Sequence, residues 1–460
     1  MNRRSLALNL PRFQVGVVAW AGALSVSWAA PVVAQGTSAE AFSLSGTTRV
    51  RIEAIDGQAR AGFGTADQLI NLRSTLLAQY RDGPVRLAAE VWDSRVYGDD
   101  AGTPVSTAEV NALELVQAFA EVRMPDILGR ESSATVAAGR FVLNLGSRRL
   151  IAADDFRNTT NGYTGVRADF VWRNGWNAVL IYTLPQQRRP DDLPALRGNA
   201  VAFDHEGFDL VLWGGLISRE QALGPVMVEA SYFHLGEHDT PGRPTRDRSL
   251  DTVSVRLFRE PAVKGFDGEL EAIAQGGTLS RSLAPDAGRQ AVRAWFVHAD
   301  VGYTFTDRWK TRLALEYDHA SGDGSAGAYG RFDTLFGMRR ADLAPSGLYN
   351  AIARSNIVSP AVRIEAAPDK VTDVMATLRP MWLAAREDSF SSTGVRDPAG
   401  RSGSFAGTQL DARLRRALTR WLRLELTTVV LKKGRFLRDA PNAPPGRWTR
   451  YFSFSIAASF

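Results

Sequence analysis

The basic side chains of this sequence are almost all arginines. Lysine and arginine together number 55 among 460 residues, and the lysines are only Lys264, Lys310, Lys370, Lys432 and Lys433. A guanidinium group pairs with a carboxylate through two parallel hydrogen bonds and tolerates partial burial better than an ammonium group. With a net charge of +6, the arginines indicate recognition of anions in a confined space. A GC-rich genome would give the same bias, so composition alone does not decide between the two interpretations.

The residue types that perform enzyme chemistry are sparse. Cysteine is absent, which excludes disulfides, thiolate zinc sites and thiol nucleophiles. The sequence has neither a phosphate loop nor a dinucleotide fingerprint. The histidines lie outside any metal-binding or nucleophile motif; they are His205, His234, His238, His298 and His319. We therefore expect no catalytic residue, no metal, no cofactor and no nucleic-acid partner.

The segments that must position the arginines alternate between apolar and polar residues. In residues 49–53, Val50 and Ile52 alternate with two arginines and a glutamate, and similar stretches recur almost to the end of the chain. Successive side chains of a strand point to opposite faces, so each stretch has one apolar face and one charged face. This arrangement suits lipid outside and water inside. Counting the stretches, the sequence predicts an all-β fold, a transmembrane antiparallel up-and-down β-barrel of about 18 strands.

The connections between these stretches alternate in length. Every second connection is a tight turn, such as Arg81–Pro84 or Arg173–Gly175, with the Asp-Gly or Asn-Gly pair of a hairpin. The others are long and rich in Gly, Pro, Asp and Arg, and we expect none of them to be shorter than about eleven residues. Long external loops that alternate with short periplasmic turns are typical of an outer-membrane barrel. The sequence does not show whether the loop Ser321–Ala353 folds inside it.

Both ends of the chain agree with export to an outer membrane. Residues 1–34 combine basic residues, the apolar stretch Val15–Ala30 and small residues at the end, which predicts a signal peptide. Residues 35–460 then form a single barrel domain. The last strand, Trp448–Phe460, has one apolar face and ends on an aromatic residue, as an outer-membrane insertion signal does. We expect the barrel-assembly machinery to recognise it through Phe460, and the barrel to lie as a monomer in the outer-membrane lipid of a Gram-negative bacterium.

If the apolar face points outward, many arginines face the lumen. Acidic residues share that face, so the arginines either make salt bridges across the wall or form a track for a polyanion. The pairs Arg49/Arg51 and Arg413/Arg415 are the best candidates for the track, since no opposite charge lies between their members. The predicted substrate-binding residues of the lumen are Arg49, Arg51, Arg73, Arg86, Arg140, Arg148, Arg167, Arg363, Arg413, Arg415 and Arg423.

A short part of the chain, Gly139–Thr159, also carries a resemblance. It contains a Gly-Arg strand, a Gly-Ser-x-Arg rim followed by Leu150, and an Asp-aromatic-x-Asn-Thr loop. In these motifs it resembles the bacterial alginate-export porin family, and Phe332–Gly337 and Arg354–Ile357 are similar to that family as well. The resemblance implies an outer-membrane barrel of about eighteen strands with an arginine-rich conduit for a uronate polymer.

The chain departs from the family pattern at three positions. Phe141 stands where a polar residue is common, Phe156 replaces a tryptophan, and Thr164 stands near an expected acid. These departures bear on the identity of the polymer more than on the fold.

The sequence therefore predicts a channel that passes an anionic polysaccharide of the alginate type, or related small carboxylates, by diffusion through an arginine-rich lumen. One alternative is a general uptake porin without polymer selectivity. The least favoured alternative is an outer-membrane barrel enzyme that assembles a site from distant strands. The direction of transport is not encoded in the pattern, because diffusion through a pore has no preferred direction.

Overall fold

The computed structural model describes residues 41–324, 327–340 and 342–460. The predicted signal peptide, residues 1–34, and residues 35–40 of the predicted barrel domain lie outside the described residues. The first nine strands are β1 Phe42–Asp56, β2 Ala66–Asp82, β3 Val85–Tyr97, β4 Asn111–Pro125, β5 Ser133–Val142, β6 Gly162–Val171, β7 Trp176–Pro185, β8 Leu210–Leu223 and β9 Val226–Glu237. The other nine are β10 Ser249–Arg259, β11 Gly265–Ser280, β12 Arg289–Thr304, β13 Arg312–Ala320, β14 Ile357–Asp369, β15 Thr372–Trp382, β16 Phe405–Ala417, β17 Leu422–Lys433 and β18 Trp448–Ser459.

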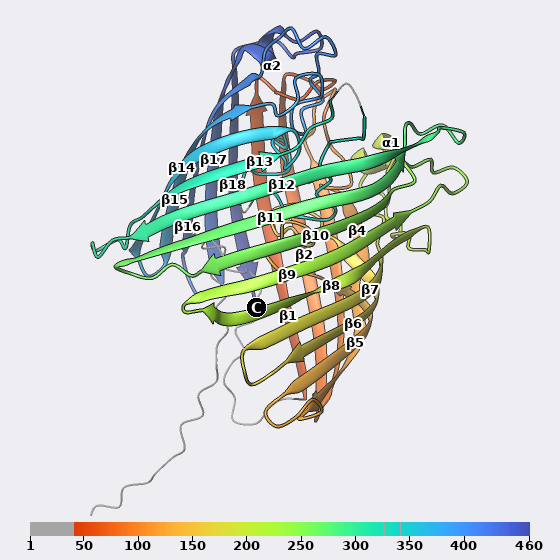
Figure 1. The fold of residues 1–460 in the computed structure, drawn as a ribbon, viewed down its shortest axis with the longest axis vertical. Helices are drawn as coiled ribbons and strands as arrows, with labels where there is room; N and C mark the ends of the chain where they lie inside the picture. The colour runs from red at the N-terminus through yellow and green to blue at the C-terminus, as the bar shows by residue number, and fades with distance from the viewer. Residues whose placement is uncertain (1–40, 325–326, 341) are drawn as a thin grey trace, which may run out of the picture.

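The strands form one closed antiparallel sheet. Each strand pairs with its neighbours in the chain, and β1 also pairs with β18, which closes the 18-stranded ring (Figure 1). At this seam the N–H of Gly46 donates to the carbonyl of Phe460 at 3.2 Å, and the N–H of Phe460 donates to the carbonyl of Gly46 at 3.1 Å. The predicted fold class, an up-and-down barrel of 18 strands, is confirmed.

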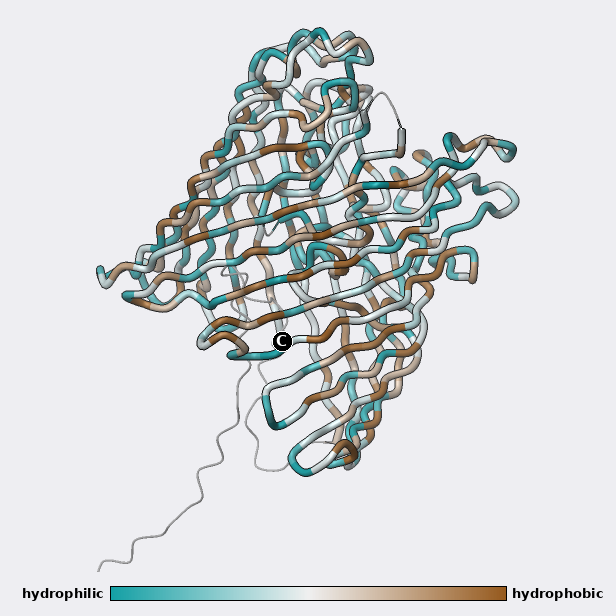
Figure 2. The backbone as a smooth tube through the Cα atoms, viewed as in Figure 1, coloured by the Kyte–Doolittle hydropathy of each residue, from teal (hydrophilic) through white to brown (hydrophobic). Residues whose placement is uncertain are grey.

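The barrel has its apolar side chains outside and its charged side chains inside. On β1, Val50 and Ile52 are 44% and 45% exposed, whereas the alternating residues Arg51 and Glu53 are 1% and 0% exposed. Figure 2 shows the resulting alternation of hydrophobic and hydrophilic residues along the strands. A soluble protein would bury the apolar side chains instead, so this inverted pattern is that of a barrel surrounded by lipid.

The loops alternate with short turns as expected, with one correction. The turn between β2 and β3 is Gly83-Pro84, where Gly83 has φ +54°, a left-handed conformation that glycine adopts without steric cost. The expectation of long outer loops throughout is wrong for residues 57–65 and 281–288, because β2, β11 and β12 extend further toward that end than the alternation in sequence indicated. A strand of a barrel gains backbone hydrogen bonds from both neighbours, which extends pairing beyond the last alternating residue.

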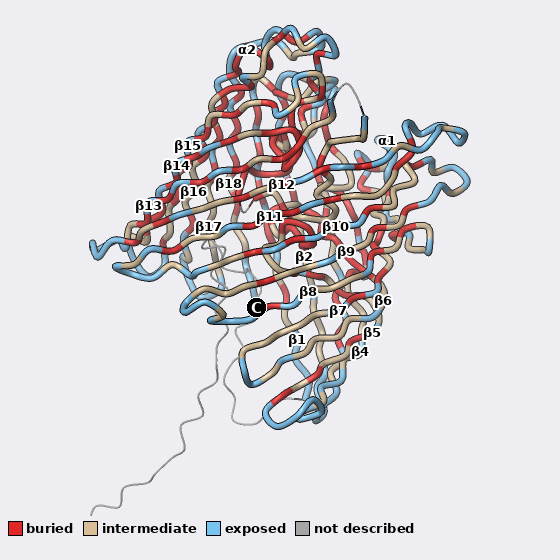
Figure 3. The backbone as a smooth tube through the Cα atoms, in the orientation of Figure 1, coloured by how far each residue is buried: buried red, intermediate tan, exposed pale blue. Residues whose placement is uncertain are grey.

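Two of the long loops fold into the barrel and form a core there. The β5–β6 loop, residues 143–161, and the β13–β14 loop, residues 321–356, contain many buried residues, among them Ile151, Tyr349 and Ile352. Figure 3 shows buried segments within the ring of strands. The long loop whose position the sequence left open therefore lies inside the barrel.

Two short helices interrupt the loops, and both lie at the end of the barrel that carries the long loops (Figure 1). Helix α1, Leu193–Arg197, belongs to the β7–β8 loop, and α2, Arg435–Asp439, to the β17–β18 loop. Neither is long and apolar enough to cross a membrane.

Candidate pore constriction

The arginines of β1 and β2 hold the β5–β6 loop against the wall. Arg49 lies directly opposite Arg73 in the register of the two strands, and like charges so placed repel each other. Both guanidinium groups instead donate to backbone carbonyls of the loop. Arg49 reaches the carbonyls of Asp155 at 3.1 Å and Arg157 at 2.8 Å, and Arg73 reaches that of Arg157 at 3.1 Å. The carbonyl dipoles thus offset the repulsion within the arginine pair.

Phe156 belongs to the same loop, and its aromatic ring lies between two arginines from different elements. The guanidinium carbon of Arg51 lies 4.3 Å from the ring centroid, and that of Arg340, from the β13–β14 loop, lies 5.1 Å away. Arg51 also donates to the carbonyl of Phe156 and pairs with Glu53 at 2.7 Å. Cations attract the face of an aromatic ring, so Phe156 joins the two inward loops to the wall.

Asn158 fixes the loop on its other side. Its amide nitrogen donates to the carbonyls of Leu72, Arg95 and Glu109, at 3.1, 3.1 and 2.9 Å. One side chain therefore binds β2, β3 and the β3–β4 loop at once. This is the physical role of the asparagine in the Asp-aromatic-x-Asn-Thr motif.

The base of the loop reaches the opposite side of the lumen through Arg149. Arg149 pairs with Glu271 of β11 at 2.6 Å and with Asp342 at 2.9 Å, and it also contacts Glu269. Asp342 in turn pairs with Arg354. The β5–β6 loop consequently spans the lumen from β1 and β2 to β11, and it narrows the passage there.

The wall formed by β11 to β15 is neutralised by ion pairs. Arg379 pairs with Glu316 at 2.9 Å and with Asp318 at 2.7 Å. Arg312 pairs with Glu365 at 3.1 Å and also contacts two aspartates. Each guanidinium here is paired with carboxylates, some of them shared as Glu316 is by Arg363 and Arg379, so this wall holds the barrel and its loops rather than offering free positive charge.

The wall formed by β16, β17, β18, β1 and β2 is different. The cross-strand register carries one row from Arg415 through Glu425 and Ser455 to Arg51, and the next row from Arg423 through Ala457 to Arg49. The residues of β18 in these two rows, Ser455 and Ala457, are small, and Glu425 of β17 is the carboxylate between Arg415 and Arg51. We call this surface the arginine wall; it consists of Arg49, Arg51, Arg73, Arg413, Arg415 and Arg423.

Arg413 of the arginine wall lacks an ion-pair partner among the described residues. Its Nε is buried without a hydrogen-bond acceptor in that part of the chain. Arg415, next to it on the same face, pairs with Asp373 at 2.8 Å. A buried donor without an acceptor carries an energetic cost that an anion would remove.

The other predicted lumen arginines are not part of this wall and are paired. Arg86 pairs with Glu121 at 3.4 Å, Arg140 with Glu114 at 2.7 Å, Arg148 with Asp155 at 2.8 Å, Arg167 with Asp169 at 2.5 Å and Arg363 with Glu316 at 2.7 Å. The structure thus brings six of the eleven predicted residues together in the arginine wall; of the other five, Arg148 lies near it through Asp155, whose carbonyl accepts from Arg49, and four lie elsewhere.

Loop arginines contribute charges that the alternation of strand residues did not reveal. Arg188 of the β7–β8 loop donates to the carbonyl of Thr160 at 3.0 Å and to Oδ1 of Asn161 at 2.8 Å, and Arg157 donates to the same Oδ1 at 2.6 Å. Burial and the charge of Arg157 lower the pKa of Arg188 to about 10, so it is still a cation at neutral pH. In the sequence, Arg149, Arg157 and Arg354 are distinguished by their positions in the family-like motifs. The alternation of inward and outward residues along strands does not identify them.

Comparison with known proteins agrees with this architecture. The family model for alginate export matches residues 41–448. The chain belongs to the alginate export family. No curated protein matches it.

Members of a porin group from Pseudomonas aeruginosa have a similar fold. OccK8 (OprE) is 10% identical with a TM-score of 0.58, and the match covers 91% of this chain and 98% of that one. OccK2 (OpdF), solved in complex with glucuronate, is 11% identical with a TM-score of 0.55 and the same two coverages. OpdK with vanillate is 10% identical with a TM-score of 0.53, again covering 91% and 98%. This alginate export family member is therefore a channel of the Gram-negative outer membrane and not an enzyme.

Proposed function

We propose that this channel passes anionic saccharides, an alginate-like polyuronate or related carboxylates, by diffusion along the arginine wall. The observation that carries the proposal is the uneven distribution of charge in the lumen. The wall of β11 to β15 has carboxylates for its arginines, whereas Arg413 has none among the described residues. A carboxylate that passes the constriction would exchange hydration water for guanidinium donors.

Transit requires that each contact be weak and that the next be near. The two rows of the register place Arg415, Arg423, Arg49 and Arg51 on adjacent levels of one face. A uronate polymer carries a carboxylate on every unit, so successive units would occupy successive levels.

The second candidate is a general uptake channel for small carboxylates. It is supported by the structural relatives, because glucuronate and vanillate, the ligands of OccK2 and OpdK, are both single carboxylates. The β5–β6 loop, which narrows the lumen, would admit a small acid as well as an extended polymer.

Reversal-potential measurements in planar bilayers test the proposal. We expect the wild-type protein to prefer anions, and Arg413→Gln to shift the reversal potential toward cations. The matched control is Arg173→Gln, which removes the same charge at a solvent-exposed turn outside the lumen, where Arg173 pairs with Glu131 at 3.1 Å. A cation-selective wild-type channel that Arg413→Glu leaves unchanged would remove the anion claim.

The two candidates are separated by current block. A uronate oligomer that blocks the open channel for longer than the single uronate supports a polymer conduit, because several arginines then act in series. Equal and brief block by both compounds supports the general channel.

A further inference from the structure

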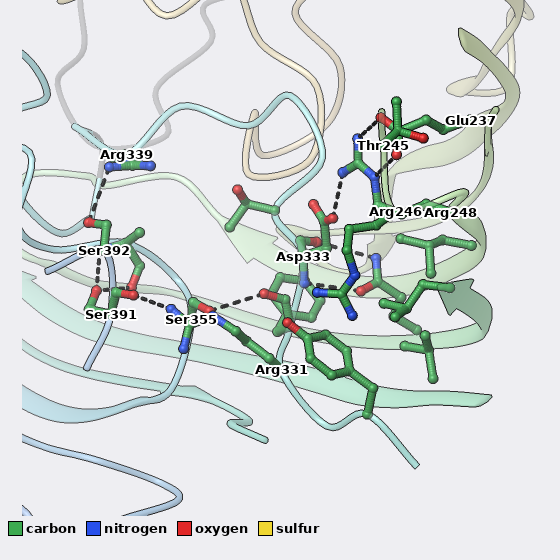
Figure 4. Close-up of a pocket in the computed structure, with 18 of the residues that line it drawn as sticks. Glu237, Thr245, Arg246, Arg248, Arg331, Asp333, Arg339, Ser355, Ser391 and Ser392 are labelled. Atoms are coloured by element: carbon green, nitrogen blue, oxygen red, sulfur yellow. Dashed lines mark hydrogen bonds and ion pairs between the residues drawn. The ribbon is translucent and has the colours of Figure 1, made fainter. Parts of the chain in front are cut away.

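A second group of arginines surrounds a cavity at the outer mouth of the barrel. The cavity has a volume of about 540 Å³ and lies among the β9–β10 loop (residues 238–248), the β13–β14 loop and the β15–β16 loop (residues 383–404) (Figure 4). Its volume is within the range of small-molecule binding sites. We call it the outer pocket. It shares no residue with the arginine wall.

Two arginines of the outer pocket are held by carboxylates of the protein. Arg248 pairs with Glu237 and with Asp333, both at 2.7 Å, and Arg331 pairs with Asp388 at 2.7 Å. These contacts fix three loops relative to one another. Figure 4 shows Arg248 between Glu237 and Asp333. The frame of the pocket is therefore held by ion pairs, in which three carboxylates face two arginines.

Two further arginines have no carboxylate partner among the described residues. Arg246 donates from Nε to the carbonyl of Ser280 at 2.5 Å, and its guanidinium lies 5.2 Å from the ring centroid of Tyr329. Both terminal nitrogens of Arg246 have no acceptor among the described residues. Arg339 contacts the amide oxygen of Asn350 and the hydroxyl of Ser392, the latter at 3.3 Å. Arg246 and Arg339 are therefore the arginines of the pocket without an ion-pair partner among the described residues.

Arg339 also connects the outer pocket to the constriction. Burial and the nearby charges of Arg157 and Arg60, opposed by Asp154, lower its pKa to about 10. It is still charged at neutral pH and lies within electrostatic reach of the β5–β6 loop. An anion bound at Arg339 would thus lie near the β5–β6 loop, which Arg49 and Arg73 of the arginine wall hold in place.

The uncharged lining suits a sugar ring. Leu250, Leu279, Val292 and Phe332 provide an apolar surface, which can cover the C–H face of a pyranose. The polar groups nearby are largely engaged with the protein; Gln275, for example, donates to Thr252 at 2.9 Å and accepts from the N–H of Asp333 at 3.0 Å. The free hydrogen-bonding capacity of the pocket is concentrated in guanidinium donors, which favours a carboxylate over a neutral hydroxyl group.

We propose that the outer pocket is a binding site for one hexuronate unit, with its carboxylate on Arg246 and Arg339 and its ring against the apolar lining. This inference rests on the proposed function, since it assigns an entry site to the same class of substrate. It differs from the arginine wall in place and in role: the wall sets selectivity within the lumen, and the outer pocket captures the saccharide at the external end.

Binding of a uronate trimer to the full-length protein in detergent, measured by calorimetry, tests the site. The methyl ester of the trimer serves as the uncharged probe. We expect Arg246→Gln or Arg339→Gln to weaken binding of the trimer about tenfold, which corresponds to one charged hydrogen bond. We expect Arg246→Lys to retain most of the affinity, and the ester to bind weakly to every variant. The matched control is Arg396→Gln in the β15–β16 loop, whose Nε donates to the carbonyl of Glu387 outside the pocket.

Bilayer measurements separate this inference from the proposed function. Arg246→Gln should slow block by the trimer added to the external side and leave the reversal potential unchanged, because the arginine wall is intact. An anion-selective channel whose trimer affinity is the same in the wild type, Arg246→Gln and Arg339→Gln overturns the outer pocket alone. A channel without anion selectivity, with no trimer binding by the wild type, overturns both proposals.

Discussion

Replacing Phe156 by leucine should release the β5–β6 loop from the wall. The ring lies 4.3 Å from the guanidinium of Arg51 and 5.1 Å from that of Arg340, and each such contact contributes about 0.5–2 kcal/mol. Taking about 1 kcal/mol for each, the substitution loses about 2 kcal/mol, roughly thirtyfold in the equilibrium between the seated and the displaced loop. Leucine is apolar but has no ring face, so it keeps burial and removes the cation contacts.

Single-channel recording measures this equilibrium directly. A displaced loop widens the lumen, so the Phe156→Leu channel should spend roughly thirty times longer in a state of larger conductance. The control is Phe119→Leu on β4, where the ring contacts the guanidinium of Arg86 at 5.1 Å on the wall and away from the loop. In an Arg340→Gln background the effect of Phe156→Leu should shrink, because one of its two cations is already gone. Recordings in which Phe156→Leu behaves as Phe119→Leu does would refute the role of the ring.

Other predictions concern stability and folding. Burial raises the pKa of Asp204 to about 6, above the unfolded value of about 3.9, so its charge destabilises the folded state above pH 6 and this cost disappears as the pH falls toward 4. Asp204→Asn should therefore raise the free energy of unfolding at pH 7, by up to about 3 kcal/mol, and give no gain at pH 4 in urea titrations. A Cβ added at Gly337 would lie 1.7 Å from the carbonyl oxygen of Arg149, whereas one at Gly324 meets no atom within 4 Å. Gly337→Ala should accelerate proteolysis of the β13–β14 loop, and Gly324→Ala should not. Val50→Arg places a charge on the lipid face at the middle of β1 and should cost about 2–4 kcal/mol, measurable by unfolding from lipid vesicles; an unchanged stability would place Val50 outside the bilayer.

The barrel could be predicted from the sequence because its signal is local and repeated. Alternation such as that of Val50 and Ile52 with Arg51 and Glu53 determines the face of each residue, and the Gly83-Pro84 turn shows where the chain reverses. Closure between β1 and β18 follows once the strand number and the apolar exterior are known. Strand ends were less predictable, since β11 and β12 continue after the alternation weakens.

The site could be predicted only in part, because the alternation of residues along a strand gives the direction of a side chain but not its partner. It placed Arg49 and Arg73 on the inner face, yet their acceptors are carbonyls of residues 155 and 157, far away in the chain. The inward loops have no fixed period, so nothing local indicated that Arg340 would reach Phe156. Glutamates and aspartates were visible on both walls, but their allocation to particular arginines depends on the register of all the strands between them.

The seam at Gly46 and Phe460 has a consequence for biosynthesis. Phe460 makes hydrogen bonds that complete the pairing of β1, so β1 keeps one unpaired edge until β18, the strand farthest from it in the sequence, has been made. Every other pairing of the barrel joins strands that are adjacent in the sequence. The edge of β1 must therefore be kept from pairing with other polypeptides until β18 is available, and a chain that lacks β18 leaves a sheet with two open edges instead of a closed barrel.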